Sequence, residues 1–247
     1  MFESIKIIGG LDKSGEPEPL NEVVIKRGES LSVVGFTGSG KSQLIRDIES
    51  LAQKDTVTKR QILTDGIIPE YKFRRNPEFK IVSHLSQNMN YVLDMECAAF
   101  LKLRAECRKS TIDTERVLSA ANSLCGEKIL PGMPLTRLSG GQSRALMIAD
   151  TAINADSPII LIDEIENAGI DKNAAMQVLT GSNKIIIVVT HDPLLALSAD
   201  KRVVMSNGGM RLLFSTSESE KNLHGELEKM SLFILDVQRK IRNGEVL

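Results

Sequence analysis

The stretch Gly35-Phe-Thr-Gly-Ser-Gly-Lys-Ser42 decides the fold. It fits the pattern G-x-x-x-x-G-K-S/T, whose glycines let the backbone curl so that successive N–H groups face one point. The apolar run Leu31–Gly35 before it predicts a buried strand, and apolar residues at helical spacing after it predict a helix over about residues 42–53. Strand, loop and helix N-terminus together predict an anion-binding cradle, because the helix dipole adds partial positive charge there.

Two side chains of the loop indicate which anion it binds. Lys41 can reach the β- and γ-phosphates of a nucleoside triphosphate, and the Ser42 hydroxyl can bind Mg²⁺. We therefore expect a magnesium-bound nucleotide in this cradle. The candidate nucleotide-binding residues of the segment are Gly35, Phe36, Thr37, Gly38, Ser39, Gly40, Lys41, Ser42 and Gln43.

A pair of carboxylates follows a later apolar strand. The segment Pro158-Ile-Ile-Leu-Ile-Asp-Glu164 places both at the end of the run Ile159–Ile162. In an open α/β sheet the carboxyl ends of the strands form the ligand crevice, so both carboxylates should face the phosphate cradle. We expect Asp163 to hold Mg²⁺, directly or through water, and Glu164 to orient and deprotonate an attacking water.

Strand and helix patterns alternate along most of the chain. Continuous apolar runs separated by helical patterns predict an α/β fold, with a parallel sheet covered on both faces. The helical stretch 94–135 interrupts this alternation and is the candidate for a separate helical subdomain. The other expected strands are Ile81–Leu85, Ile185–Val189 and Val203–Met205, and the other expected helices start at Asp94 and span about Thr114–Leu124 and Ser143–Asn154.

The composition is that of a globular protein without a general affinity for polyanions. The 247 residues carry a formal net charge of -1, so no basic field exists to hold nucleic acid or anionic lipid. Aromatic residues make up 4% of the chain, which argues against a surface that stacks single-stranded bases. No apolar run approaches the roughly 20 residues of a membrane helix. Three cysteines without metal-ligand spacing fit a reducing cytosol.

The segment Leu138-Ser-Gly-Gly-Gln142 precedes another expected helix. Ser139 and the two glycines would present backbone donors and a helix N-terminus to a second anion. A chain with one phosphate loop needs no second donor site unless that site serves the nucleotide of another molecule. In the order of these motifs the chain resembles the ATP-binding cassette (ABC) ATPases, and Leu138–Gln142 matches their signature motif residue for residue.

The resemblance covers about residues 1–210 and implies further roles. By that resemblance, Gln87 stands at the Q-loop, which senses Mg²⁺ and couples to a partner, and Asp171 stands in the D-loop. His191 stands at the switch histidine, which contacts the γ-phosphate. The implied catalytic residues are Glu164, His191 and Lys41, the implied metal ligands are Ser42, Gln87 and Asp163, and the residues implied to cap ATP in trans are Leu138, Ser139, Gly140, Gly141 and Gln142.

The resemblance also implies an architecture and an assembly. The fold is that of a P-loop NTPase, with a RecA-like, mostly parallel core sheet, an N-terminal antiparallel β part and the helical subdomain. The implied nucleotide-binding domain spans residues 1–215, with 1–93 and 136–215 as catalytic core and 94–135 as helical subdomain, and residues 216–247 form a C-terminal helical extension. ATP and Mg²⁺ are the implied ligands, and two cassettes, identical or paralogous, close head to tail around them.

The chain departs from the family pattern in two places. The family's adenine-stacking aromatic is missing between Ile5 and Arg27, so either aliphatic contacts hold adenine or base selectivity is loose. After Asp163, Ile165 replaces the family's proline, and Asp171 follows eight residues on instead of seven. The extra residue predicts altered communication across the dimer without gross loss of hydrolysis.

Three roles for such a cassette are open at this point. A single cassette without membrane segments favours the ATPase subunit of a transporter, peripheral on the inner face of the membrane, with a separate transmembrane subunit docking at Gln87 and residues 88–110. The unusual loop after Asp163 and the heptad-like tail favour a cytoplasmic cassette that remodels or activates a soluble protein complex. The third role is a non-hydrolysing regulatory module, against which Glu164 and His191 count.

The C-terminal tail predicts a long helix. Ser217 and Glu220 can form a capping box at its start. Phe233 and Leu235 widen its apolar face, which favours packing on its own domain. Self-association or docking on a partner is the alternative, because the apolar residues follow a heptad-like seam. The residues of this seam are Leu223, Leu227, Met230, Ile234, Val237 and Ile241.

Overall fold

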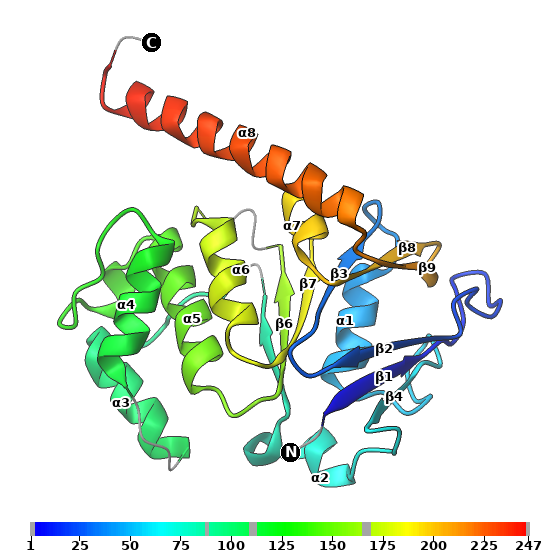
Figure 1. The fold of residues 1–247 in the computed structure, drawn as a ribbon. Coiled ribbons are helices and arrows are strands. Elements are labelled where there is room, and N and C mark those ends of the chain that lie inside the picture. Colours follow the sequence, from blue (N-terminus) through cyan, green and yellow to red (C-terminus); the bar gives the residue numbers. More distant parts are fainter. Residues whose placement is uncertain (1–2, 87–88, 109–112, 165–168, 246–247) are drawn as a thin grey trace.

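The computed structural model describes residues 3–86, 89–108, 113–164 and 169–245. A six-stranded sheet lies at its centre, with strand order β5-β6-β7-β3-β8-β9 (Figure 1). Neighbouring strands in this sheet run parallel except β8 and β9, which are antiparallel. Its strands are β3 (Ser30–Val34), β5 (Val82–Leu85), β6 (Ile159–Asp163), β7 (Ile185–Val189), β8 (Lys201–Ser206) and β9 (Gly209–Ser215).

A smaller antiparallel sheet is built from the N-terminal part of the chain. Its strand order is β2-β1-β4, and it consists of β1 (Ser4–Ile8), β2 (Glu22–Lys26) and β4 (Gln61–Thr64). The expected α/β fold, with a mostly parallel core sheet and an N-terminal antiparallel part, is therefore confirmed.

The large sheet separates two hydrophobic cores. Because side chains alternate across a strand, Ile159 and Leu161 of β6 join one core, and Ile160 and Ile162 join the other. The first core also holds the apolar residues of the antiparallel sheet and of the helix after the phosphate loop. The second holds the apolar faces of the helical segment 94–135. Continuous apolar strands arise here because both faces of the sheet are buried.

The helices cover both faces of the large sheet. Helix α1 lies on the side of the antiparallel sheet, while α4, α5 and α6 lie on the opposite side (Figure 1). The α-helices are α1 (Lys41–Glu49), α2 (Tyr71–Arg75), α3 (Cys97–Arg108), α4 (Thr114–Leu124), α5 (Gly140–Asn154), α6 (Lys172–Thr180), α7 (Pro193–Ser198) and α8 (Glu218–Arg242), and the short 3-10 helices are η1 (Pro77–Phe79) and η2 (Leu135–Arg137).

Several expected boundaries were wrong. The helix after the phosphate loop ends at Glu49 rather than near residue 53, because the chain turns at Leu51 with a φ of 48° and Gln53 then bridges to Gln61. That bridge leads into β4, which the polar composition of residues 54–80 concealed. Strand β9 was also not predicted. It pairs antiparallel with β8 after a tight turn at Asn207, and this pairing is not visible in the sequence of residues 209–215.

Helix α8 begins where the sequence predicts. Ser217 Oγ accepts from the Glu220 N–H at 3.3 Å, and Glu220 Oε2 accepts from the Ser217 N–H at 2.9 Å, so the capping box is confirmed. Its first half is attached to the domain, because Glu228 accepts a hydrogen bond from Asn173 of α6 at 2.9 Å. Its second half extends beyond α7 and away from the body (Figure 1). Packing on its own domain is thus correct for the first half only.

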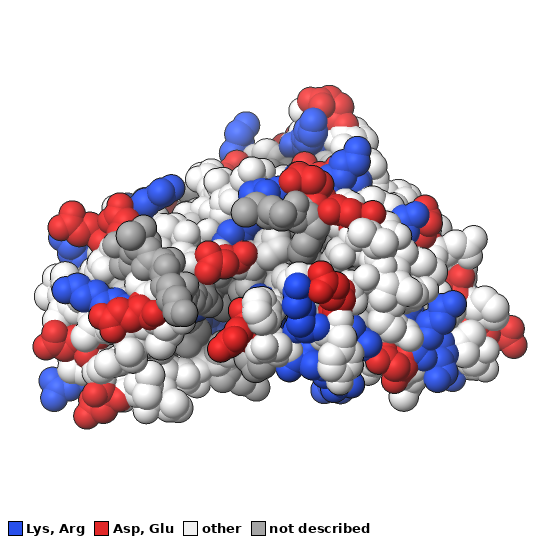
Figure 2. Space-filling view, turned by 90° about the horizontal axis from the view of Figure 1, so that it is seen from below, with Lys and Arg blue, Asp and Glu red and all other residues white. Residues whose placement is uncertain are grey.

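The surface seen from below mixes charges of both signs. Lysine and arginine side chains alternate there with aspartate and glutamate rather than gathering into one patch (Figure 2). Across residues 3–86, 89–108, 113–164 and 169–245, no helix combines the length and hydrophobicity that crossing a membrane requires.

Candidate nucleotide-binding site

Three neighbouring strands bring the predicted site residues to one edge of the sheet. Strand β7 lies between β6 and β3, and all three run parallel. The phosphate loop leaves β3, Asp163 and Glu164 end β6, and His191 follows β7. Because the carboxyl ends of parallel strands meet at the same edge, the loop, the carboxylates and the histidine face a common crevice.

The phosphate loop has the backbone form that its glycines predict. Gly40 is the N-cap residue of α1 with a φ of 101°, a left-handed conformation that favours glycine, and no side chain caps this helix. The N-terminus of α1 therefore faces the loop without a competing side-chain cap. Lys41 is 7% exposed, and its Nζ donates to the carbonyl oxygens of Gly35 at 2.8 Å and Phe36 at 3.2 Å. These bonds curl the loop around the ammonium group.

Observations on this loop fit a triphosphate and a divalent cation. Ser39 Oγ is buried and has no hydrogen-bond partner among the described residues. Buried hydroxyls are normally hydrogen-bonded, so a bound ligand could supply the missing partner. Thr37, Gly38 and Ser42 are exposed at the open side of the loop. The Ser42 hydroxyl and the Asp163 carboxylate supply the oxygen ligands that Mg²⁺ prefers. ATP with Mg²⁺ thus fits the residues present.

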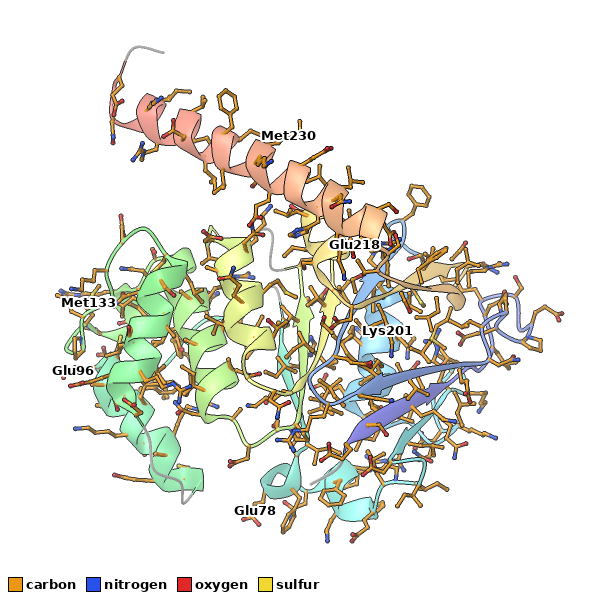
Figure 3. The ribbon with its side chains drawn as sticks, viewed as in Figure 1. Glu78, Glu96, Met133, Lys201, Glu218 and Met230 are labelled. Carbon is orange, nitrogen blue, oxygen red and sulfur yellow. The ribbon has the colours of Figure 1, made fainter. Side chains whose placement is uncertain are left out.

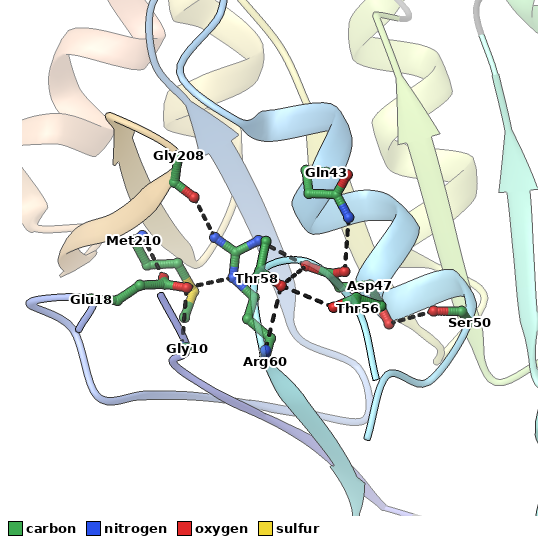
Figure 4. Close-up of polar contacts among 10 residues, drawn as sticks. All are labelled: Gly10, Glu18, Gln43, Asp47, Ser50, Thr56, Thr58, Arg60, Gly208 and Met210. Carbon is green, nitrogen blue, oxygen red and sulfur yellow. Dashed lines mark hydrogen bonds and ion pairs between the residues drawn. The ribbon is translucent and has the colours of Figure 1, made fainter. Parts of the chain in front are cut away.

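A buried ionic network lies behind the loop (Figure 4). Arg60 is fully buried, and its Nε donates to Glu18 Oε1 at 2.7 Å while its Nη1 donates to Asp47 Oδ2 at 2.9 Å. Its Nη2 donates to the carbonyl oxygen of Gly208 at 2.7 Å. Thr58 adds a hydroxyl bond to Asp47 at 2.8 Å. One guanidinium therefore joins α1, the loop before β2 and the turn between β8 and β9.

The β8–β9 turn forms the floor of the phosphate loop. The Gly208 N–H donates to the Ser39 carbonyl at 2.9 Å. A Cβ on Gly40 would lie 2.7 Å from the Cα of Gly208, so the two backbones touch with no space for a side chain. Lys13 reaches the same region, where its Nζ donates to the Gly38 carbonyl at 2.6 Å. Lys13, Arg60 and Gly208 were missed by sequence analysis, because nothing in their sequence neighbourhoods indicates these distant contacts.

Gln43 faces this network rather than the open side of the loop. Its Nε2 donates to Asp47 Oδ1 at 3.0 Å, and its backbone N–H donates to the Gly40 carbonyl at 3.1 Å. The structure therefore gives Gln43 a position behind the predicted nucleotide site.

The two carboxylates and the histidine lie close together. Asp163 pairs with Val189 in the register of β6 and β7. Glu164 then adopts a left-handed conformation with a φ of 51°, and its N–H donates to the Val189 carbonyl at 3.0 Å. This turn directs the Glu164 side chain to His191, whose Nε2 lies 3.9 Å from Glu164 Oε1. The predicted base and the predicted switch histidine thus share one side of the crevice.

The signature segment forms the start of α5. Ser139 is its N-cap residue, and Ser139 and Gln142 make a reciprocal capping box, with the Ser139 N–H donating to Gln142 Oε1 at 2.9 Å. Gly140 is exposed, with open space where a Cβ would stand. In Figure 1, helix α6 and strands β6 and β7 stand between α5 and α1. The structure therefore does not place Ser139 at the phosphate loop of its own chain.

Asp171 and its neighbour connect the helical part to the crevice. Asp171 caps α6 by accepting from the N–H groups of Asn173 and Ala174, and its own N–H donates to the Leu124 carbonyl at the end of α4. The next residue, Lys172, bonds Asp192, which follows His191. Gln87, the predicted Q-loop residue, and Ile165, which replaces the family's proline, lie outside the described residues.

Comparison with known proteins decides the family. The family model described as ABC transporter matches residues 21–167. The uncharacterized ABC transporter ATP-binding protein MJ0121 of Methanocaldococcus jannaschii is 51% identical over 99% of this chain and 94% of its own length. This chain belongs to the ABC transporter family. It is an ATPase cassette of that family, and the expected role of a transporter-energising subunit agrees with this membership.

Further relatives of the cassette are more distant. The zinc import ATP-binding protein ZnuC of Roseobacter denitrificans is 27% identical over 74% of this chain and 67% of its own length. The solved structure of CbiO1 from Clostridium perfringens superposes with a TM-score of 0.64 at 22% identity, covering 99% of this chain and 100% of that one. The dimeric, ADP- and phosphate-bound cassette MJ0796 gives 0.61 at 19% identity, covering 86% and 99%. These structures share the P-loop NTPase fold.

Proposed function

We propose that this ABC cassette works as one half of a head-to-tail pair with two composite ATP sites. The observation that carries this proposal is the position of the signature segment. Its donors at the start of α5 stand apart from the phosphate loop of the same chain (Figure 1), yet Gly140 is exposed as a ligand-facing residue would be. In a two-fold pair, Leu138, Ser139, Gly140, Gly141 and Gln142 of each chain close on the triphosphate held by the other.

Each chain holds the nucleotide from its own side. The backbone N–H groups of residues 35–42 bind the phosphates, and Lys41 turns from its carbonyl partners to the β- and γ-phosphates. Ser42 and Asp163, together with Gln87, would hold Mg²⁺. When bound, Mg²⁺ neutralises charge on the phosphates during phosphoryl transfer. Ser39 gains the hydrogen-bond partner that its buried hydroxyl lacks among the described residues.

Hydrolysis uses the carboxylate and histidine at the ends of β6 and β7. Glu164 accepts the proton of the attacking water, and His191, 3.9 Å away, holds the γ-phosphate in line. Loss of the γ-phosphate removes contacts that both chains make, so the closed pair opens. Asp171 caps α6, and its N–H bonds the Leu124 carbonyl at the end of α4. Closure of the pair at Asp171 would therefore shift the helical subdomain.

A separate transmembrane subunit is the proposed partner. A groove of about 810 Å³ runs between the core sheet and the helical segment, lined by β5, α3 and α5. It mixes apolar side chains such as Tyr91, Phe100 and Met147 with Lys80 and Arg104. Tyr91 Oη and His84 Nε2 are buried there without a hydrogen-bond partner among the described residues, so polar groups remain to be satisfied by an inserted segment. Docking there would hold the cassette at the inner face of the membrane.

Complementation between two defective chains tests the composite sites. Lys41→Ala removes the phosphate contact of one side, and Ser139→Arg blocks the capping donors of the other. Each variant alone should lose ATPase activity. Co-expressed with two different tags and purified through both, the mixed pair has one site carrying both defects and one site carrying none. We expect this mixed pair to recover hydrolysis.

The matched control places both substitutions in one chain and pairs it with the unaltered chain. Each site of that pair then carries one defect, so it should be inactive if the sites are composite. Activity in this control pair together with no activity in the mixed pair would mean that each chain completes its own site, and the proposal would be wrong.

A further inference from the structure

We propose that α8 pairs antiparallel with α8 of a second copy of this chain, and that this contact holds two cassettes together when no nucleotide is bound. The inference rests on the proposed function in one respect, namely that the cassette acts as a pair. It goes further in assigning a permanent contact that does not involve the nucleotide.

An exposed apolar face on α8 is the first observation. Met230 is 63% exposed, Ile234 54% and the flanking Phe233 69%. No described residue of α8 joins either hydrophobic core of the domain. Figure 3 shows that Met230 lies on the part of α8 that extends from the body. Contiguous apolar surface of this kind marks an interaction site.

The domain contacts use a different edge of the helix. Glu220 pairs with Arg202 at 2.5 Å, and Glu228 pairs with Asn173 at 2.9 Å, both in the first half of α8. His224 and Ser231 lie on the half-buried side near these contacts. The seam residues Leu223 and Met230 remain exposed beside them. Leu227 and Val237 of the seam are half-buried, and the other four seam residues are exposed, so another helix can pack along the seam while α8 stays attached to its domain.

The charges along α8 select a second copy in the antiparallel direction. Residues 218–229 contain four acidic and two basic side chains, and residues 230–242 contain one acidic and three basic side chains. The first half thus has a net charge of -2 and the second half of +2, and the ion pair of Glu220 with Arg202 of the domain leaves the first half at -1. Parallel pairing would set like charges together, whereas antiparallel pairing sets each acidic half against a basic half.

The heptad spacing fixes the register of this pairing. With Ile234 on the two-fold axis, it contacts Ile234 of the partner subunit, and Leu227 meets Ile241 of the partner subunit. Glu226 then flanks Lys240 of the partner subunit. Phe233 covers the centre by contacting its own copy. A two-fold axis perpendicular to a helix always produces this antiparallel, self-complementary arrangement.

A permanent contact changes what ATP has to do. The α8 contact keeps the two cassettes at a high effective concentration. ATP binding then closes a dimer that already exists, and hydrolysis opens it, so ATP does not have to bring two separate chains together. The same two-fold symmetry serves the α8 contact and the composite ATP sites, so one closed dimer can contain both.

Sedimentation velocity of the full chain without nucleotide tests the proposal. The unaltered chain should be dimeric at micromolar concentration. Ile234→Glu should weaken the dimer by at least about tenfold in Kd, because it places a charge at the centre of the seam. Leu232→Glu is the matched control, since Leu232 is exposed on the same turn but lies off the seam, and it should leave the dimer intact. Circular dichroism checks that each variant keeps α8 helical.

Charge exchange tests the direction of the helices. Lys240→Glu should weaken the nucleotide-free dimer, and adding Glu226→Lys in the same chain should restore it. A nucleotide-free chain that is monomeric throughout, an equal loss with Leu232→Glu, or no restoration in the double variant would each overturn the proposal. If the nucleotide-free chain is monomeric and Ile234→Glu abolishes its binding to a membrane subunit, the seam is the docking surface for that subunit instead.

The outcome is separable from that of the proposed function. In the Ile234→Glu background, a hydrolysis-blocked chain should still dimerise when ATP is added, because the composite sites remain. If only the nucleotide-free dimer fails to form, the α8 contact is wrong and the composite sites stand. If only the ATP-induced dimer fails to form, the composite sites are wrong and the α8 contact stands.

Discussion

Lys172 Nζ lies 2.5 Å from Asp192 Oδ2, and this bond ties the start of α6 to the segment after β7. Lys172 follows Asp171, the residue that caps α6, and Asp192 follows His191 and caps α7. Two segments that are expected to respond to nucleotide are therefore linked by one ion pair. Burial opposes ionisation of Asp192, but the hydrogen bond and charge of Lys172 outweigh it and lower the pKa of that carboxyl.

Asp192→Asn should lower the stability of the domain by about 0.5–1 kcal/mol at pH 7, the usual size for a partly exposed ion pair. Asparagine keeps the helix cap, so the loss reports the charge. Because the folded pKa is below the unfolded value, the contribution is present above about pH 4 and disappears as the pH falls through the folded pKa. Urea unfolding of both proteins at pH 7 and pH 3 measures this, and a constant difference at both pH values would contradict it.

Glu164→Gln should slow ATP hydrolysis by about 100-fold or more, because a general base contributes on this order. ATP binding should persist, since the amide leaves the phosphate loop untouched, and a dimer should accumulate with ATP. Phosphate release and ATP-dependent sedimentation are the two measurements. Hydrolysis at the parent rate would remove Glu164 from the role of base.

Lys41→Ala should weaken ATP binding by about tenfold or more, because a hydrogen bond to a charged group contributes about 1.5–3 kcal/mol. Lys6→Ala is the control, since Lys6 lies on β1 and pairs with Glu22 at 3.0 Å, away from the loop. Titration calorimetry with ATP compares the two. Equal affinities for both variants would show that Lys41 does not bind phosphate.

Arg60→Met should destabilise the domain by about 3–5 kcal/mol, because it leaves the buried carboxylates of Glu18 and Asp47 without their cation. Since Arg60 also holds the floor of the phosphate loop, ATP affinity should fall along with stability. Arg75→Met is the control, because Arg75 is exposed. Urea unfolding with and without ATP measures both effects.

Adding Glu18→Gln and Asp47→Asn to Arg60→Met should recover part of the lost stability, because the uncompensated charges are then removed. A lack of recovery would mean that the shape of the network, rather than its charge balance, supports the domain.

The sequence predicted the parts of the site that depend on neighbouring residues. The phosphate loop, Asp163 with Glu164, and the donor segment Ser139–Gly141 are each short segments whose chemistry follows from adjacent residues and the strand or helix beside them. The role of His191 was implied by the family resemblance, and its place in the crevice follows from its position just after the strand Ile185–Val189. The structure confirms the strands on which these inferences depended, whereas the helix after Ser139 starts at Gly140 rather than at the expected Ser143.

Long-range pairing set the limit of prediction. Arg60 bonds Glu18, Asp47 and Gly208, which lie far from it and from one another in the sequence, so no local pattern marks it as central. Strand β4 was hidden for the same reason, since its pairing with β1 rather than its own polar composition makes it a strand. The C-terminal tail was ambiguous because the same heptad spacing is expected for a helix that packs on its own domain and for a helix that binds another helix.

The contact of Gly40 with Gly208 has a consequence for the order of biosynthesis. The phosphate loop at residues 35–42 is synthesised well before the turn at Gly208 that supports it. A nascent polypeptide that has not reached residue 208 carries the complete loop motif without its support. We therefore expect competence to hold nucleotide only after residue 208 has been synthesised and has reached the loop.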